Sequence, residues 1–388
     1  MSVKNFTPPV VLLLIVGTTI IHFRHTISRW WLLRSYPHDL QQIYQPKRSS
    51  DTIVHCFDNE FRASIPIYKK GENFYTTYDF EKNRLEGSDT IYISVKGDDS
   101  YSGRNRQTAK HSIEAALRAK AHNIILLEGR YKSGIHFKSN THLSDVNLIG
   151  EGRVVIDNMG RVPLAVTGNV FIHNIEFANG SRGSLRAYLE DPYKVCTYVC
   201  CKFNNSLVDD ADVSKALSLG GLRIQGGTHY LYRCEASYNG YDGFSYHAAP
   251  DGSLNAPHVA EVECKAFHNG EHNAYESNNA STAHDGTHII RLNCAYGYSH
   301  GGNVADVHNG TVSYNVGCTA YSAMDLGMNF RKYQANYFCA TNGVMYLLSC
   351  KSYGSYYDLS SWNSGNILSD KVYKREYTDN GSIILLKK

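Results

Sequence analysis

Proline and net charge are both scarce in this sequence. It has 9 prolines in 388 residues, and its 39 lysines and arginines nearly balance its 36 aspartates and glutamates, which leaves a formal net charge of +3. Because there is no basic stripe, we predict no nucleic-acid partner. No pair of histidines with metal-ligand spacing lies on a predicted helix. We therefore predict no cofactor, with a Ca²⁺ site kept as an alternative.

Glycine (32 residues) and tyrosine (29 residues) are abundant, and a short apolar word that ends in cysteine recurs. The final cysteines are 34, 30, 30, 24 and 32 residues apart. A constant strand joined by connections of variable length is typical of a solenoid. The six words are KVCTYVC (194–200), THYLYRC (228–234), HVAEVEC (258–264), HIIRLNC (288–294), VSYNVGC (312–318) and VMYLLSC (344–350).

Within each word every second residue is apolar, which is the period of a strand with one buried face. We expect the final cysteines to form one inward ladder, and the residues between the apolar positions to face solvent. We therefore predict an all-β chain, a single-stranded right-handed parallel β-helix. The ladder is Cys200, Cys234, Cys264, Cys294, Cys318 and Cys350, and the solvent-facing residues are Arg233, Glu261, Glu263, Arg291, Asn293, Asn315 and Ser349.

Ten cysteines would indicate disulfides in a secreted protein. Six of them, however, occupy one repeated inward position, where a cysteine is readily buried as a small apolar side chain. We therefore expect buried thiols in the ladder instead of a disulfide framework.

The N-terminal segment at residues 6–23 is nearly free of charge and contains VVLLLIV. It predicts an uncleaved transmembrane anchor at 1–23, with a buried helix as the alternative. A juxtamembrane linker and lead-in at 24–89 and a β-helix domain at 90–388 would follow. Arg24, Arg29 and Arg34 would keep the body in the cytoplasm, which conflicts with the export that we expect for the solenoid. We expect a single-pass membrane protein with an extracytoplasmic solenoid, and the charges leave the orientation open.

From Thr90 the chain predicts a strand, a turn in GDDSYSG (97–103), a short helix within 111–121 capped by Ser112, and a strand that ends in EGRY (128–131). This order resembles the start of right-handed parallel β-helix proteins of the pectate-lyase-like superfamily. The resemblance implies that the helix caps the N-terminal end of the solenoid and that the ligand is a polysaccharide.

Candidate functional residues concentrate in three connections of the repeat, 239–257, 269–287 and 301–311. His284 and His308 both lie ten residues before the next ladder cysteine, and His258 and His288 both lie six before it. Equal offsets predict that each pair stacks on adjacent coils. Grouped histidines and carboxylates mark sites, whereas an Asp next to Gly is also a common turn former. The acids and histidines of these connections are Asp242, His247, Asp251, Glu271, His272, His284, Asp285, Asp306 and His308.

The segment DGFSYH (242–247) resembles the Asp-Pro-His-Asp catalytic segment of β-helical mannuronan C5-epimerases. Tyr246 stands where that segment has proline, and Ala248 where it has the second acid. The resemblance implies that Asp242 and His247 are site residues.

These residue types suit the removal of the proton on C5 of a uronate, which needs a base of near-neutral pKa and a cation for the carboxylate. We predict a membrane-anchored lyase or C5-epimerase of an acidic glycan. The alternatives are a β-helix that binds a glycan or a partner without catalysis, and a glycoside hydrolase with paired aspartates. The predicted catalytic residues are His247, His284, Asp242, Asp285, Asp306 and His308, and the predicted substrate-binding residues are Arg291, Arg233, Tyr246 and Tyr275.

Overall fold

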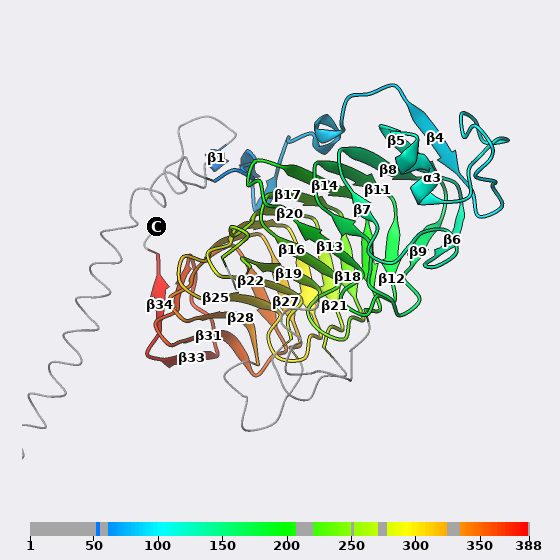
Figure 1. Cartoon of the computed structure of the whole chain (residues 1–388). Coiled ribbons are helices and arrows are strands. Elements are labelled where there is room, and N and C mark those ends of the chain that lie inside the picture. Colours follow the sequence, from blue (N-terminus) through cyan, green and yellow to red (C-terminus); the bar gives the residue numbers. More distant parts are fainter. Residues whose placement is uncertain are drawn as a thin grey trace, which may run out of the picture.

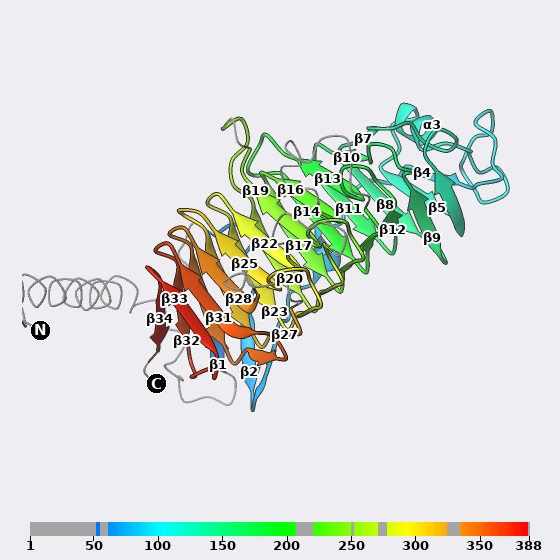
Figure 2. The ribbon, with the colours of Figure 1, turned by 90° about the horizontal axis from the view of Figure 1, so that it is seen from below.

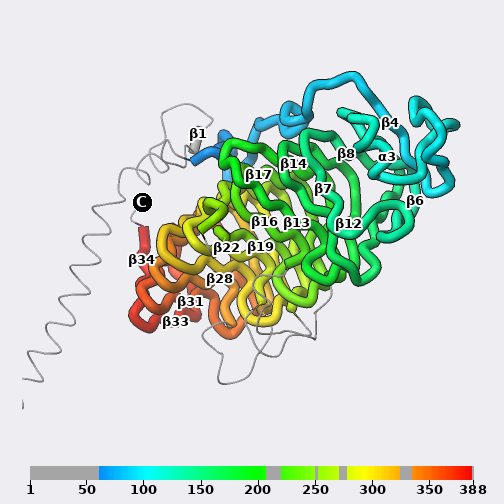
Figure 3. Tube along the Cα trace, in the orientation of Figure 1, coloured from blue at the N-terminus to red at the C-terminus, as the bar shows by residue number. Residues whose placement is uncertain are grey.

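The computed structural model describes residues 61–206, 220–249, 252–270, 278–323 and 334–386, together with the backbone of a strand at Thr52–Val54 (Figure 1). Within these residues the chain winds in successive coils whose strands build three parallel sheets. Figure 3 shows the coils following one another from the cyan end to the red end. The structure is the all-β parallel β-helix that the sequence predicts.

Each sheet runs the length of the solenoid, and neighbouring strands pair in register (Figure 2). Sheet I has 12 strands: β4 (Thr90–Ile93), β5 (Asn123–Leu126), β8 (Val146–Gly150), β11 (Val170–His173), β14 (Val195–Val199), β17 (Thr228–Tyr232), β20 (His258–Val262), β23 (His288–Leu292), β26 (Val312–Val316), β29 (Val344–Leu348), β32 (Asn366–Ser369) and β34 (Ser382–Leu385).

Sheet II follows sheet I in each coil and has 9 strands: β6 (Gly129–Lys132), β9 (Val154–Asp157), β12 (Glu176–Ala178), β15 (Lys202–Asn204), β18 (Glu235–Ser237), β21 (Lys265–Phe267), β24 (Ala295–Gly297), β27 (Thr319–Tyr321) and β30 (Lys351–Tyr353). Sheet III completes the coil with 10 strands: β7 (His142–Leu143), β10 (Ala165–Val166), β13 (Leu185–Tyr188), β16 (Leu222–Gln225), β19 (Phe244–His247), β22 (Ser281–His284), β25 (Val304–Val307), β28 (Ala335–Ala340), β31 (Tyr357–Trp362) and β33 (Glu376–Asp379).

A single left-handed residue turns the chain from sheet I to sheet II. This residue interrupts the alternation of the strand, so the side chain after it points inward whatever the phase of the strand before it. Its φ lies between 53° and 63° in seven successive coils, at Asn174, Cys200, Arg233, Glu263, Asn293, Gly317 and Ser349.

The inward ladder after this turn is confirmed for five of its six predicted members, Cys234, Cys264, Cys294, Cys318 and Cys350, all buried. The first member is wrong by one position. Cys200 is exposed at the left-handed turn, and Cys201 takes the inward place. All nine cysteines among the described residues are free, which confirms thiols in the ladder.

The predicted direction of the strand faces in sheet I is wrong from β17 onward. Tyr230, Val262 and Ile290 lie on the outer face, whereas Glu261 and Arg291 point into the solenoid and are 0% exposed. The period of two was correct, but both faces of these strands are buried, so apolar character does not mark the inner face.

The outer face of sheet I is covered by residues 61–86, which we call the strap (Figure 1). The strap includes the antiparallel strands β2 (Ile67–Lys70) and β3 (Asn73–Tyr75), which pair with each other, and a 3₁₀ helix at Phe80–Asn83; β2 also pairs with β1 (Thr52–Val54). Phe80 stacks on Tyr232 with ring centroids 4.6 Å apart. The sequence predicted this stretch as a linker and lead-in without a sustained period, whereas it buries sheet I.

The predicted helix is α3 (Ile113–Arg118), and the Ser112 hydroxyl accepts a hydrogen bond from the amide of Ala115 as an N-cap. Ile113 and Ala116 join the solenoid core beside β4. Its role as the cap of the solenoid stays a prediction. The predicted anchor at 1–23 lies outside the described residues, and none of the described helices is long and apolar enough to cross a membrane.

Candidate functional site

Three histidines and one aspartate meet on the outer face of sheet III. His247 ends β19 and His284 ends β22, while Asp285 and His308 directly follow β22 and β25. Because side chains alternate along a strand, both strand histidines face outward while Tyr246 and Ala283 face the core. We call His247, His284, Asp285 and His308 the histidine cluster.

The three imidazole rings form one contiguous set. The rings of His247 and His284 stack with centroids 4.3 Å apart at 18°, and His308 meets His284 edge-on at 5.3 Å and 66°. Asp285 bridges the outer two, with one oxygen 3.4 Å from Nδ1 of His247 and the other 2.5 Å from Nδ1 of His308. The contact between His284 and His308 predicted from their equal offsets is confirmed. The contact between His258 and His288 is also confirmed, with centroids 5.0 Å apart under the strap.

Hydroxyl groups two residues earlier on the same strands orient the cluster. Ser245 Oγ lies 3.0 Å from Nε2 of His247, and Thr282 Oγ1 lies 2.6 Å from Nε2 of His284. Ser245 also donates to Asp242 at 3.4 Å, and Asp242 accepts the amide of Asn279 at 2.7 Å. Asp242 is thus joined to the cluster through Ser245, as a buried residue that holds the turn before β19.

The environment separates the pKa values of the histidines. Burial lowers the pKa of His247, although Asp285 opposes the shift. Burial, reinforced by the neighbouring imidazoles, lowers the pKa of His284 well below its usual value. The hydrogen bond with Asp285 raises the pKa of the half-exposed His308.

Burial alone would raise the pKa of Asp285, but hydrogen bonds with His247 and His308 bring it well below the usual range. At neutral pH the cluster therefore holds a carboxylate, neutral imidazoles at His247 and His284, and at His308 the imidazole that most readily carries a proton. Neighbouring groups with separated pKa values suit paired acid and base roles.

Three of the other predicted site residues lie inside the solenoid. Arg291, Asp306 and Tyr246 are each 0% exposed, so none of them reaches the outer face that carries the histidine cluster. The expectation that Arg291 and Asp306 converge with the histidines in one groove is wrong. The side chains of Arg291 and Asp306 point into the solenoid, whereas those of the histidines lie on its outer face.

Arg291 and Asp306 instead belong to an interior ion network, which we define as Glu261, Ser281, Arg291, Asp306 and Asn315. Arg291 donates from Nε to Ser281 at 2.8 Å and from Nη1 to Asp306 at 3.1 Å. Glu261 accepts from Ser281 at 2.6 Å and from Tyr296 at 2.5 Å, and lies 3.8 Å from Nε of Arg291. The network links sheets I and III from within, and Tyr296 of β24 connects it to sheet II.

Two predicted substrate-binding residues remain, Arg233 and Tyr275. Arg233 stands at the turn from sheet I to sheet II, where it pairs with Glu263 at 2.7 Å. The histidine cluster instead lies at the end of β22, where the chain passes from sheet III to sheet I, so Arg233 is not adjacent to it. Tyr275 lies outside the described residues, as do Asp251, Glu271 and His272.

The sequence interpretation missed two arginines that share the face of the cluster. Arg186 and Arg223 are paired in register on β13 and β16, and Arg223 pairs with Ser245 on β19. Both guanidinium groups lie near the ring of Tyr188, at 5.1 and 5.8 Å from its centroid. A second recurring word could have revealed them, because LRAY, LRIQ, FSYH and STAH occupy the same place in successive coils.

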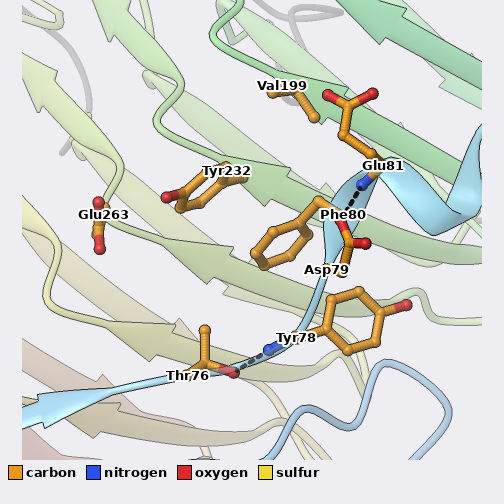
Figure 4. Close-up of a pocket in the computed structure, with 8 residues that line it drawn as sticks. All are labelled: Thr76, Tyr78, Asp79, Phe80, Glu81, Val199, Tyr232 and Glu263. Carbon is orange, nitrogen blue, oxygen red and sulfur yellow. Dashed lines mark hydrogen bonds between the residues drawn. The ribbon is translucent and has the colours of Figure 1, made fainter.

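A cavity of about 250 Å³ lies on another sheet, between the strap and the outer face of sheet I (Figure 4). Asp79 and Glu81 belong to its strap side, and Glu263, which is already paired with Arg233, belongs to its solenoid side. None of the predicted site residues lines it. Among the described residues no group of three or more His, Cys, Asp or Glu side chains is arranged to hold a metal ion.

No protein-family model matches the chain, and no curated protein matches it. Solved structures of similar fold include the pectate lyase Pel9A, with 16% identity and a TM-score of 0.41 over 70% of this chain and 78% of that one. A rhamnogalacturonan lyase has 13% identity and a TM-score of 0.41 over 76% and 88%. A GH136 lacto-N-biosidase from Eubacterium ramulus has 9% identity and a TM-score of 0.28 over 76% and 68%.

Proposed function

We propose that this β-helix is a carbohydrate-active enzyme that removes the proton next to the carboxylate of a uronate, as a polysaccharide lyase or a C5-epimerase. The observation that carries the proposal is the histidine cluster, in which neutral imidazoles and a carboxylate-bound imidazole meet on an outer face beside two arginines. Folding does not require three contacting imidazoles at the ends of successive strands.

His284 is the base in this proposal. When its Nε2–H donates to Thr282, 2.6 Å away, Nδ1 keeps the lone pair that accepts the C5 proton. The lowered pKa keeps the imidazole neutral at neutral pH and makes it a weaker base in the free chain than an imidazole of ordinary pKa. The ring of His247 stacks on that of His284, and its Nδ1 contacts one oxygen of Asp285, whose other oxygen contacts His308.

His308 is the acid. In a lyase reaction the C5–H electrons form the C4–C5 double bond, the C4–O bond breaks, and the proton of His308 goes to the leaving oxygen. In an epimerase reaction a proton returns to C5 from the opposite face. Asp285 raises the pKa of His308, so the acid keeps its proton until it is needed.

Arg223 takes the place of the predicted Arg291 as the partner of the substrate carboxylate. Burial lowers the pKa of Arg223, but a guanidinium stays protonated at any physiological pH. Its register with Ser245 places it one coil from His247 on the same face. Such a cation stabilises the charge that develops on the carboxylate when C5 loses its proton.

The paired-aspartate hydrolase has less support. It needs two carboxylates on either side of one sugar bond. Of the three predicted acids, Asp306 is inside the solenoid and Asp242 is buried against the amide of Asn279. Asp285 alone of the three is partly exposed, and it is engaged by two histidines.

The test is turnover of uronate polymers. The chain is incubated with polygalacturonate and with alginate, and the near-ultraviolet absorbance of an unsaturated product is followed; in deuterated water, label at C5 reports epimerisation. His284→Gln and His308→Gln should each lower turnover by about 10²–10⁴-fold. The matched control is His122→Gln, an exposed histidine near the N-terminal end, which should keep full activity.

Full turnover by both cluster variants would overturn the proposed roles. Binding of the polymers without any turnover by the unmodified chain would leave the non-catalytic glycan-binding alternative in its place.

We also propose that the apolar segment at 6–23 anchors the enzyme in a membrane as a single-pass protein with the solenoid outside the cytoplasm. The support is its freedom from charge over eighteen residues. Resistance of the full chain to alkaline carbonate extraction, and protease access to the solenoid in intact cells, test the two parts.

A further inference from the structure

A row of aromatic side chains runs along the corner where sheet II turns toward sheet III. Two positions of successive coils supply it, the last residue of the sheet II strand and the left-handed residue after it. We call this row the aromatic strip: Tyr238, Phe267, His268, Tyr298, Tyr321 and Tyr353.

The rings from Tyr238 to Tyr321 contact one another from coil to coil, and Tyr353 follows Tyr321 in register on the next coil. Tyr238 stacks on His268 at 5.1 Å, and His268 on Tyr298 at 4.9 Å. Tyr298 then meets Tyr321 edge-on at 5.3 Å and 85°. The strip crosses from β18 to β30, which at about 4.8 Å per coil makes it about 19 Å long.

Three residues of the strip have a backbone conformation that is unfavourable for bulky side chains, whereas the preceding coils have asparagine at the same position. Tyr238, His268 and Tyr298 have φ of 58°, 55° and 53°, a region that bulky side chains rarely adopt. In the two preceding coils the same position is Asn179 and Asn205, and asparagine is among the residues best suited to it. Bulky rings held in this conformation point to a role other than stability.

The rings of the strip are also exposed to solvent, whereas rings that stabilise a fold are usually buried. Tyr238 is 58% exposed, Tyr353 is 55% and Tyr298 is 40%. Gly297 allows the ring of Tyr321 to lie against the sheet, since a Cβ there would be 2.8 Å from Cε2 of that ring. Aromatic side chains in an exposed, contiguous row mark a binding surface.

The shape of the strip favours a linear polymer. It is only one or two side chains wide, whereas a stable protein partner needs about 800 Å² on each side. Two residues before Phe267 and Tyr353, on the same face, stand the exposed lysines Lys265 and Lys351. Ring faces and edges beside exposed lysines suit the apolar faces and anionic groups of an acidic polysaccharide.

We propose that the aromatic strip is a second glycan-binding site, which holds an acidic polysaccharide lengthwise along the solenoid, separate from the histidine cluster. The strip and the cluster belong to the same coils but to opposite ends of the sheet III strands, because Tyr238 and Tyr298 precede β19 and β25 whereas His247 and His308 end or follow them. The site does not depend on turnover at the cluster.

The test compares binding of polygalacturonate, alginate and the neutral galactomannan by affinity gel electrophoresis. The variant Tyr238→Asn/Tyr298→Asn places in the strip the residue that the preceding coils have at this position. We expect acidic-polymer affinity to fall by about tenfold, because two exposed rings of the strip are lost, while the melting temperature stays the same or rises. Tyr101→Asn, at an exposed tyrosine of the N-terminal loop, is the control and should bind as the unmodified chain does.

Three outcomes would overturn the proposal. They are unchanged affinity in the double variant, an affinity loss that follows a matching fall in melting temperature, and equal binding of the neutral polymer. His284→Gln separates this site from the proposed catalysis, because it should lower turnover by about 10²–10⁴-fold and leave the affinity of the strip for the acidic polymers unchanged.

Discussion

The histidine cluster and the interior ion network use the same strands of sheet III but lie on opposite faces. Thr282 and His284 of β22 point outward to the cluster, while Ser281 of the same strand points inward to Arg291. On the outside Asp285 and His308 keep contact with solvent while His247 is buried, and the pKa values of the cluster separate. On the inside every charge must be matched, because an unpaired charge in the core is very costly. The face of the strand on which an ionisable side chain lies, more than its residue type, decides whether it contributes to the proposed chemistry or to stability.

Thiol reactivity should show the largest contrast between the outside and the inside of the solenoid. Cys200 is exposed and Cys201 is buried, although they are neighbours in the sequence. Because a buried thiol reacts only after unfolding, Cys200 should be alkylated at least about 10³-fold faster than Cys201 in the native chain at mildly alkaline pH. Peptide mapping after timed alkylation measures both rates, and equal rates would contradict the placement.

Loss of Arg291 should destabilise the fold strongly. Arg291→Met leaves Asp306 and Glu261 buried without their cation, and removal of one partner from a buried ion pair costs about 3–5 kcal/mol. Urea denaturation measures the change. The matched control is Arg233→Met, which breaks the exposed pair with Glu263 and should cost far less, because solvent screens that pair. Similar losses in the two variants would refute the difference between the faces.

The interior network should also make stability depend on pH. Burial raises the pKa of Glu261 to about 7 from 4.5, although Arg291 opposes the shift. The folded state therefore binds a proton that the unfolded state has already lost between these values. The stability contributed by this group is full below pH 4.5 and declines by about 3 kcal/mol as pH rises through about 7. Glu261→Gln should remove this decline, and Glu263→Gln, at the exposed turn, should keep it; an unchanged pH slope in Glu261→Gln would disprove the assignment.

The histidine cluster should matter least for stability. His308 is 47% exposed, so His308→Gln should change the free energy of unfolding by less than about 0.5 kcal/mol at neutral pH. Thermal and urea unfolding of this variant measure the effect. A loss comparable to that of Arg291→Met would show that the cluster is part of the framework of the solenoid.

The sequence predicted the coil, the register and most of the ladder, because a fixed strand length and a repeated cysteine are local signals. Equal offsets from the cysteines also brought His284 to His308. The inner and outer faces of sheet I could not be predicted, since two long-range facts decide them. The left-handed residue at positions such as Arg233 resets the alternation before Cys234, and the strap makes Tyr230 a buried residue on the outer face. Arg291 was therefore predicted on the wrong side of the sheet.

The strap has a consequence for synthesis on the ribosome. Asn293 donates a hydrogen bond to the carbonyl oxygen of Phe74 across 219 residues of sequence, and the amide of Arg62 donates to His258 across 196. At 5–20 residues per second, the strap emerges roughly 10–45 s before the surface that buries it exists. The coils can stack one on the next as they are made, because each contacts its neighbours. During this time Phe61, Phe74 and Phe80 of the strap are uncovered, so we expect chaperones that bind nascent chains to bind this segment first. The strap can dock only after the coils up to β26 have formed.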